Sequence, residues 1–385
     1  MSQKHNISYL DYNSTTPIDP RVVDAMLPYL KDNFGNSSST HHFGQIISEN
    51  VKQARNQIAR FIKSEPNEVV FTSGATEAIN LSIKGVAESY KDKGKHIITV
   101  STEHKAVLDT CGDLERKGFE VTYLPVEENG LLSLELLESS IRPDTILVSV
   151  MYVNNETGVI QPIKKFAEIT HQKGALFMTD ATQAVGKIAV DVKELDIDLL
   201  CFSGHKMYAP KGVGALFIRK NDKRVNITPQ THGGGQETGL RSGTLNVPGI
   251  VALAKACEIS SLEMNDDRTI ISELRDKLEY ELLRMPNTAL NGDSIKRIYN
   301  TTNICFKEQD ANVLIGRMRN IAVSNGSACS SAIFEPSHVL KSMGLSNDDA
   351  LASLRFSLGK YNTIEDVELV VETIRKLTEP QSKYA

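Results

Sequence analysis

The sequence predicts an α/β protein: a large domain with a mostly parallel seven-stranded sheet, followed by a smaller α+β C-terminal domain. Three observations support this prediction. From about residue 20 to residue 220, short apolar runs alternate with segments of helical periodicity, which is typical of parallel strands joined by helices. A glycine-rich stretch at residues 232–239 interrupts the alternation, and a long helical segment follows it. A chain of 385 residues is long enough for two domains.

Seven short apolar runs provide the expected strands of the large domain. They are residues 68–72, 96–101, 120–125, 145–153, 175–179, 199–202 and 213–218. Helices long enough to cover the sheet are expected at residues 20–30, 44–62, 77–90 and 163–172, and a longer one at 247–284. We therefore expect a large domain at residues 15–260 and a small domain made of residues 1–14 and 261–385.

Composition and charge disfavour several classes of function. The net charge is −5 and the basic residues are spread along the chain, which argues against direct binding to nucleic acid or to a membrane surface. No apolar run approaches the ~18 residues of a membrane span, and the N-terminus has no apolar signal segment, so we expect a cytoplasmic protein. The five cysteines form no CxxC pair, which disfavours a zinc site.

A lysine and an aspartate follow two of the predicted strands. Lys206 comes shortly after the strand at 199–202, and Asp180 ends the strand at 175–179. The carboxyl ends of strands are where open α/β sheets place reactive groups. A buried carboxylate needs a cationic partner, and the protonated ring nitrogen of pyridoxal phosphate is one. Taken alone, Lys206 is more simply explained as a surface lysine and Asp180 as a helix N-cap.

The segment 72–77, Thr-Ser-Gly-Ala-Thr-Glu, lies between a predicted strand and a predicted helix. Its N–H and hydroxyl donors, together with the helix dipole, favour binding of a phosphate group. Ser203 and His205 flank Lys206 and are placed to bind the same phosphate from the other side. An ordinary helix N-cap explains the segment equally well when it is considered by itself.

His104, Asn155 and Gln183 also lie just beyond predicted strands. The His104 imidazole is suited to stack on a pyridine ring and to transfer a proton. Asn155 and Gln183 are suited to hydrogen-bond the ring hydroxyl. Each residue is separately compatible with an ordinary turn or helix start.

Cys329 has different surroundings from the other cysteines. It lies in the stretch 324–331, which consists of small, turn-favouring residues and predicts an exposed loop. The apolar or helical surroundings of the others predict buried packing; these are Cys111, Cys201, Cys257 and Cys305. A thiol at Cys329 can act as a nucleophile once the site removes its proton.

Taken together and in this order, the motifs resemble those of a fold-type I, class V aminotransferase, and specifically of the NifS/IscS-like cysteine desulfurase family. The resemblance extends over nearly the full length. It rests on residues 9–17 (YLDYNSTTP), 72–80 (TSGATEAIN), 101–104 (STEH), 154–158 (NNETG), 180–183 (DATQ), 203–206 (SGHK), 241–244 (RSGT), 324–330 (SNGSACS) and 354–359 (LRFSLG).

The resemblance implies removal of sulfur from L-cysteine with pyridoxal phosphate as the cofactor. Lys206 would carry the cofactor and Asp180 would contact its ring nitrogen. The remaining cofactor contacts would come from His104 on the ring, from Asn155 and Gln183 at the ring hydroxyl, and from Ala75, Thr76, Ser203 and His205 at the phosphate. Thr244 would bind the phosphate of the neighbouring subunit, which implies a homodimer.

Substrate and sulfur are assigned to three further positions by the same resemblance. Arg355, together with Asn155, would hold the substrate carboxylate. Cys329 would take the substrate sulfur as a persulfide, release L-alanine, and pass the sulfur to an acceptor or iron–sulfur scaffold protein. No resident metal is expected; any contact with an iron–sulfur cluster would be transient and through Cys329.

Other activities stay open on the sequence alone. A selenocysteine lyase or another class V aminotransferase would use the same cofactor site, although transamination needs no thiol at Cys329. A sulfur-relay protein that only presents a persulfide is a third possibility, and the acceptor could serve iron–sulfur assembly, tRNA thiolation or cofactor synthesis. The chain departs from the family pattern at residues 36–39 (NSSS) and 236–239 (QETG), and it ends at Ala385 without the longer extension of the housekeeping type. That leaves scaffold recognition through such an extension open.

Overall fold

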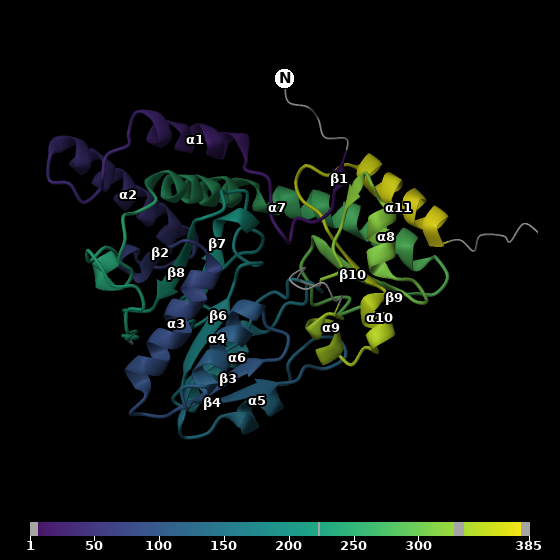
Figure 1. Cartoon of the computed structure of the whole chain (residues 1–385), viewed down its shortest axis with the longest axis horizontal. Helices are drawn as coiled ribbons and strands as arrows, with labels where there is room; N and C mark the ends of the chain where they lie inside the picture. The colour runs from purple at the N-terminus through teal and green to yellow at the C-terminus, as the bar shows by residue number, and fades with distance from the viewer. Residues whose placement is uncertain (1–6, 222–223, 327–334, 379–385) are drawn as a thin grey trace, which may run out of the picture.

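The computed structural model describes residues 7–221, 224–326 and 335–378. A seven-stranded sheet forms the centre of its larger part (Figure 1). The sheet order is β2-β8-β7-β6-β5-β3-β4, and only β8 runs antiparallel to its neighbours, so the predicted mostly parallel sheet is confirmed. The strands are β2 (Val69–Thr72), β3 (His96–Val100), β4 (Glu120–Leu124), β5 (Thr145–Ser149), β6 (Leu176–Asp180), β7 (Leu199–Ser203) and β8 (Gly214–Ile218).

Two helical layers cover the faces of this sheet. In β2, Phe71 packs into one hydrophobic core and Val70 into the other, because neighbouring side chains of a strand point to opposite faces. Burial on both faces explains why the strands are continuous apolar runs in the sequence. One layer contains α1 (Pro20–Lys31), α2 (His42–Phe61), α5 (Leu134–Ser140), α6 (Ile163–Gln172) and the first half of α7 (Val247–Leu283), and the other contains α3 (Ala75–Tyr90) and α4 (Lys105–Glu115).

The predicted strand at residues 145–153 is longer than the observed one, since β5 ends at Ser149. Val150 and Val153 lie beyond its end but are still buried in the core. The apolar residues after Ser149 therefore made the predicted strand longer than the part that pairs with a neighbouring strand. The helices α4 and α5 are short, at 11 and 7 residues, and their apolar patterns were too brief to be predicted individually.

A second, antiparallel sheet forms the smaller part of the molecule, with the order β12-β10-β9. Its strands are β9 (Thr288–Leu290), β10 (Thr301–Phe306) and β12 (Ser353–Ser357). The N-terminal strand β1 (Ser8–Tyr9) pairs in parallel with β11 (Ile321–Ala322), so both ends of the sequence contribute to this part. Its helices are α8 (Ala311–Arg317), α9 (His338–Ser342), α10 (Asn347–Leu351) and α11 (Ile364–Thr378). Three short 3-10 helices belong to the larger part: η1 (Pro66–Glu68), η2 (Gly204–Lys206) and η3 (Glu237–Gly239).

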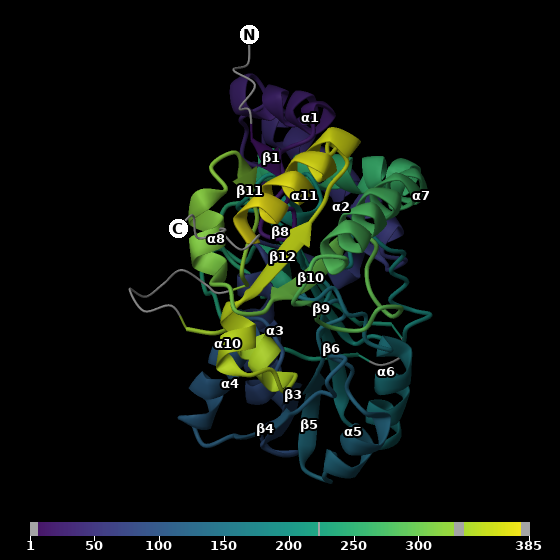
Figure 2. The ribbon, with the colours of Figure 1, turned by 90° about the vertical axis from the view of Figure 1, so that its right-hand side faces the viewer.

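The helix α7 joins the two parts. Its residues up to Ile259 belong to the core of the large part, whereas those from Ile271 onward pack in the small core, where α11 lies beside α7 (Figure 2). We therefore propose a domain boundary within α7 near residue 260. Within the described ranges, none of the helices, including α7 with its 37 residues, is long and apolar enough to cross a membrane.

Candidate active site

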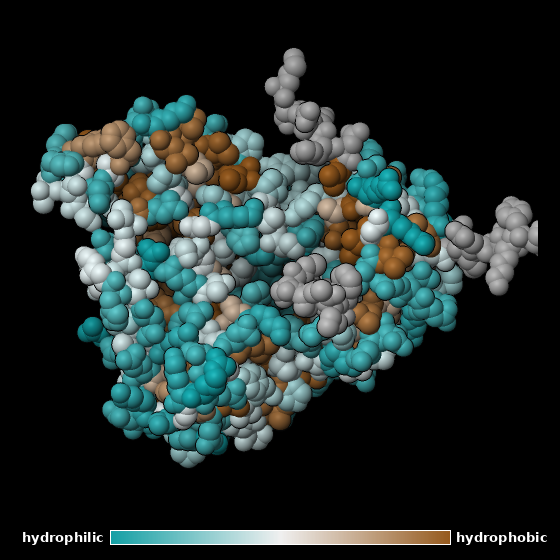
Figure 3. All heavy atoms as spheres, in the orientation of Figure 1, coloured by the Kyte–Doolittle hydropathy of each residue, from teal (hydrophilic) through white to brown (hydrophobic). Residues whose placement is uncertain are grey.

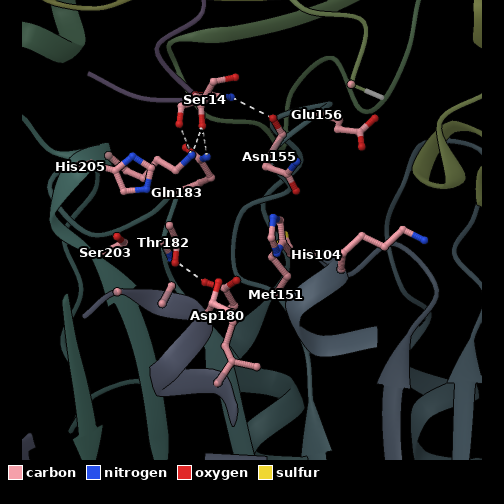
Figure 4. A pocket seen from close by; sticks show the side chains of 18 of the residues that line it. Ser14, His104, Met151, Asn155, Glu156, Asp180, Thr182, Gln183, Ser203 and His205 are labelled. Atoms are coloured by element: carbon pink, nitrogen blue, oxygen red, sulfur yellow. Dashed lines mark hydrogen bonds between the residues drawn. The ribbon is translucent and has the colours of Figure 1, made fainter. Parts of the chain in front are cut away.

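A cavity of about 770 Å³ opens where the carboxyl ends of the parallel strands face the small part. Figure 4 shows Asp180 at its base, with His104 and Asn155 on one side and Ser203 and His205 on the other. Ten predicted site residues line it: Ala75, Thr76, His104, Asn155, Asp180, Gln183, Ser203, His205, Lys206 and Arg355. Thr244 is exposed and outside the cavity lining. Cys329 lies outside the described residues.

Lys206 ends the 3-10 helix η2, directly after β7. Its Nζ donates hydrogen bonds to the backbone carbonyl oxygens of Asn13 at 2.7 Å and Ser14 at 2.5 Å. Burial, and secondly the positive charge of Arg355, lower the pKa of Lys206 to about 8. The lowered pKa makes the neutral amine, the form a nucleophilic lysine requires, more accessible near neutral pH.

Asp180 ends β6 and is almost fully buried. Its Oδ1 accepts a hydrogen bond from the Thr182 backbone N–H at 2.9 Å, but residues 182–187 form turns rather than a helix, so the helix N-cap explanation is not observed. Glu103 lies nearby, and its burial, together with the Asp180 charge, raises the pKa of Glu103 well above its usual value. Asp180 thus lies at the base of the cavity beside a carboxyl group whose burial favours its neutral form.

His104 is the N-cap residue of α4, and its Nδ1 accepts a hydrogen bond from the Ala106 N–H at 3.1 Å. Helix capping, the simpler explanation for this histidine, is thus observed together with its place in the cavity. Because Nδ1 must accept, the proton of the neutral ring is on Nε2. The cap therefore fixes both the tautomer and the direction of the ring.

The start of α3 has features that suit binding of an anion. Gly74, the N-cap residue, gives no side-chain hydrogen bond to the first turn, so the N–H groups there are available to an anion. A Cβ at Gly74 would lie 3.4 Å from the Ser203 hydroxyl, which brings a further donor to the same place. His205 shares a hydrogen bond with Thr15 at 3.2 Å, and burial lowers the pKa of His205 to about 4, so its ring is neutral.

Gln183, through its side chain, and Asn155, through its backbone, both contact Asn13. Gln183 donates from Nε2 to the Asn13 carbonyl oxygen at 2.9 Å, the same oxygen that accepts from Lys206. The carbonyl oxygen of Asn155 accepts from Asn13 Nδ2 at 3.2 Å. Within the described chain, Asn155 Oδ1 is buried without a hydrogen-bond partner. A buried, unsatisfied acceptor on the cavity wall is a position where a bound ligand would supply the missing donor.

Arg355 reaches the cavity from β12 and is buried rather than solvated. Nη1 donates to the Asn155 carbonyl oxygen at 2.9 Å, and Nη2 donates to Ser14 Oγ at 2.8 Å. Among the described residues, its Nε has no partner. A buried guanidinium with a free donor is suited to bind a carboxylate.

Several residues near the site were not predicted to act there. Asn13 and Ser14 lie far from Lys206 in sequence, yet their carbonyl oxygens hold it. Glu156 lines the cavity and accepts from Ser337 Oγ at 2.5 Å. Lys187 lies behind the wall and contacts Gln183. In the sequence, these residues were distinguished only by lying within one of the quoted motifs or shortly after one.

The four cysteines predicted to pack in the interior are all buried: Cys111, Cys201, Cys257 and Cys305. Burial raises the pKa of each thiol, and that of Cys111 reaches about 12. None of these four lines the cavity. They are therefore unsuited to act as thiolates near neutral pH.

Comparison with known proteins gives consistent results. The aminotransferase class-V family model matches residues 8–370. The chain is 51% identical to the cysteine desulfurase IscS of Ehrlichia chaffeensis over 96% of this chain and 92% of the relative. It is 50% identical to a probable mitochondrial cysteine desulfurase of Dictyostelium discoideum, over 96% of this chain and 82% of that protein.

Solved structures agree with the sequence relatives. A NifS-like protein superposes with a TM-score of 0.91 at 38% identity, covering 96% of this chain and 99% of the other. A structure described as SspA in complex with cysteine gives a TM-score of 0.81 at 37% identity, covering 92% and 99%. The chain therefore belongs to the class-V aminotransferase family and, within it, to the NifS/IscS-like cysteine desulfurases.

Proposed function

We propose that this protein is a pyridoxal-phosphate-dependent cysteine desulfurase, which converts L-cysteine to L-alanine and retains the sulfur as a persulfide on Cys329 for an acceptor protein. One observation carries the proposal: a single cavity contains a lysine of lowered pKa, a buried aspartate and an arginine with a free donor. The similarity over nearly the whole chain to proteins named cysteine desulfurase supports it.

The cavity fits pyridoxal phosphate by the chemistry of its donors. The uncapped start of α3 with Ala75 and Thr76 suits the phosphate, and Ser203 and His205 lie close to it. Asp180 suits the protonated ring nitrogen, and Lys206 suits the aldehyde carbon. Asn155 and Gln183 are proposed partners of the ring hydroxyl, with His104 against the ring face. When bound, this cofactor supplies an electron sink for the bonds at the substrate Cα.

The side chains of the protein then have separate tasks. Arg355 binds the substrate carboxylate and so fixes the orientation of the amino acid. Lys206, whose lowered pKa allows it to accept a proton at Nζ, is the base for the Cα proton. His104 lines the cavity, and because its Nδ1 accepts from Ala106, Nε2 is the ring nitrogen placed to exchange a proton. Asp180, buried at the base of the cavity, is placed to balance positive charge on the ring.

Sulfur transfer is assigned to Cys329. Its thiolate attacks the sulfur of the bound cysteine, an S–S bond forms, and the Cβ–S bond of the substrate breaks. The electron pair of that bond remains on the carbon, which takes up a proton to become the methyl group of L-alanine. The balance is one L-cysteine and one enzyme thiol giving one L-alanine and one enzyme persulfide.

A homodimer is part of the proposal. Hydrophobic side chains are exposed on α1, in the connection that follows it and at the start of α2, and Figure 3 shows apolar surface over α1. They are Val23, Leu27, Leu30, Phe34 and Ile46. A contiguous apolar surface of this kind is typical of an interface. Thr244 is exposed outside its own cavity, as expected of a residue that contributes to the site of the partner.

The test is turnover of the purified, cofactor-loaded protein with L-cysteine. We expect a visible absorption band from the lysine-bound cofactor, and L-alanine and sulfide in equal amounts when a thiol reductant is present. Lys206→Ala should abolish both products. Alanine formation that depends on an added keto acid, without sulfide, would indicate an aminotransferase. A faster reaction with L-selenocysteine than with L-cysteine would indicate a selenocysteine lyase.

A further inference from the structure

Lys187 is a buried lysine one layer behind the wall of the cavity. It lies in the turn region after β6 and is 7% exposed. Its Nζ donates to Gln183 Oε1 at 2.5 Å and to Asn13 Oδ1 at 3.2 Å. It does not line the cavity itself, so it has no direct access to a molecule bound there.

The environment of Lys187 is unfavourable for a cation. In the part of the chain that the structure describes, no carboxylate pairs with it, and the charged groups that act on it are the positive Lys206 and Arg355. Burial, followed by those two charges, lowers the pKa of Lys187 to about 7. An unpaired buried lysine costs stability, and an apolar side chain of similar length would cost less. Stability alone therefore does not account for a lysine at this position.

The hydrogen bonds of Lys187 lead directly to the site. Gln183 has one acceptor oxygen, and when Lys187 donates to it, the Nε2 amino group must point the other way. There it donates to the Asn13 carbonyl oxygen at 2.9 Å. The same oxygen accepts from Lys206 Nζ at 2.7 Å. One side chain behind the wall thus determines which end of Gln183 faces the cavity and steadies the carbonyl group that holds Lys206.

We propose that Lys187 is a positioning residue that holds the Gln183 amide with its N–H donors toward the ring hydroxyl of the cofactor and, through Asn13, fixes the direction of the Lys206 amine. The proposal rests on the proposed function, because it concerns the same cofactor site. Without Lys187, the Gln183 amide is free to rotate and to present its oxygen to an anionic ring oxygen, which is repulsive.

The test compares Lys187→Met and Lys187→Gln with the unchanged protein, all loaded with pyridoxal phosphate. Methionine and glutamine are both one atom shorter than lysine; methionine has no N–H donor, whereas glutamine keeps a neutral one. Lys360→Met is the matched control, since the Lys360 side chain is only 9% exposed but pairs with Asp19 and lies over the rings of Tyr208 and Tyr361. The readouts are the pH midpoint of the visible absorption band, the cofactor dissociation constant and the thermal midpoint.

Turning the Gln183 N–H away from an anionic ring oxygen, and removing the positive charge behind Gln183, raises the proton affinity of that oxygen. We therefore expect Lys187→Met to move the absorption midpoint upward by about one pH unit and to weaken cofactor binding about fivefold. Lys187→Gln should recover at least half of the shift, and Lys360→Met should leave the midpoint unchanged. Failure of the unchanged protein to bind the cofactor would count against the proposed function rather than against this inference.

A purely structural role for Lys187 predicts the opposite ranking of the Lys187→Met and Lys187→Gln variants. Methionine would then be the better variant, because it buries no polar group, and its absorption midpoint would equal that of the unchanged protein. Loss of folding in Lys187→Met but not in Lys360→Met would also assign Lys187 a structural role. Either result would overturn the proposal.

Discussion

Arg355 Nη2 lies 2.6 Å from Asp11 Oδ1, across a sequence separation of 344 residues. The ion pair joins β12 to the segment after the N-terminal strand and holds the guanidinium in the cavity. Its Nε has no partner among the described residues. The group is therefore oriented in advance, with a donor available to the substrate carboxylate.

Replacing Arg355 by lysine should impair substrate binding more than cofactor binding. Lysine keeps the charge but lacks the planar fork that allows two parallel hydrogen bonds. We expect the KM for L-cysteine to rise about 10- to 100-fold, which corresponds to about 1.4–2.8 kcal/mol. Steady-state kinetics together with titration of the cofactor check this. A KM that stays the same in Arg355→Lys would remove the carboxylate-binding role.

The buried Glu156 makes the stability of the folded protein depend on pH in a predictable direction. Burial raises the pKa of Glu156 from 4.5 to about 7, so the folded protein holds its proton where the unfolded chain has lost it. Stability from this group is therefore fully present below the unfolded pKa and is lost as pH rises through about 7. Glu156→Gln should be more stable than the unchanged protein at pH ~8 by on the order of 2 kcal/mol, with a much smaller difference near pH ~5.

Urea unfolding at the two pH values measures this difference for Glu156→Gln. Glu168→Gln, an exposed position on α6, is the control and should change stability little at either pH. An equal effect of Glu156→Gln at both pH values would show that ionisation of Glu156 does not contribute.

The proposed dimer predicts that assembly and cofactor affinity are linked. An aspartate at Phe34, which is 76% exposed on the apolar surface near α1, should produce monomers because it buries a charge in the interface. These monomers should bind pyridoxal phosphate at least about tenfold more weakly, since Thr244 of the partner is then missing. Ile295→Asp, at a position 87% exposed in the small part, is the control. Sedimentation measures the assembly state, and cofactor titration measures the affinity for pyridoxal phosphate. A fully active Phe34→Asp monomer would contradict the link between assembly and cofactor binding.

The sequence predicted the central sheet because its strands are covered on both faces. Runs such as residues 199–202 are apolar throughout and are bounded by polar residues, so β7 was expected nearly as observed. Apolar character misled at residues 150–153, because Val150, Met151 and Val153 are buried without belonging to β5. Strand ends then located most of the site, because Asp180, Lys206 and His104 all follow parallel strands at one edge of the sheet.

What the sequence did not predict depends on contacts between distant segments. The carbonyl oxygens of Asn13 and Ser14 hold Lys206, and a backbone group carries no residue-specific signal. Lys187 is indistinguishable from a surface lysine until its burial is known. The pKa values of Glu156 and Lys187 likewise follow from their surroundings in the fold.

The assignment of the sulfur to Cys329 is the central claim, and it is tested most directly by locating the persulfide. The unchanged protein and its five single Cys→Ser variants are incubated with L-cysteine, labelled with a persulfide-specific alkylating reagent and mapped by mass spectrometry, with L-alanine measured in parallel. We predict that the label is on Cys329 and that only Cys329→Ser lowers alanine formation to near background, while its visible spectrum still responds to L-cysteine. Normal alanine release by Cys329→Ser, or a label on Cys111, Cys201, Cys257 or Cys305, would contradict the account.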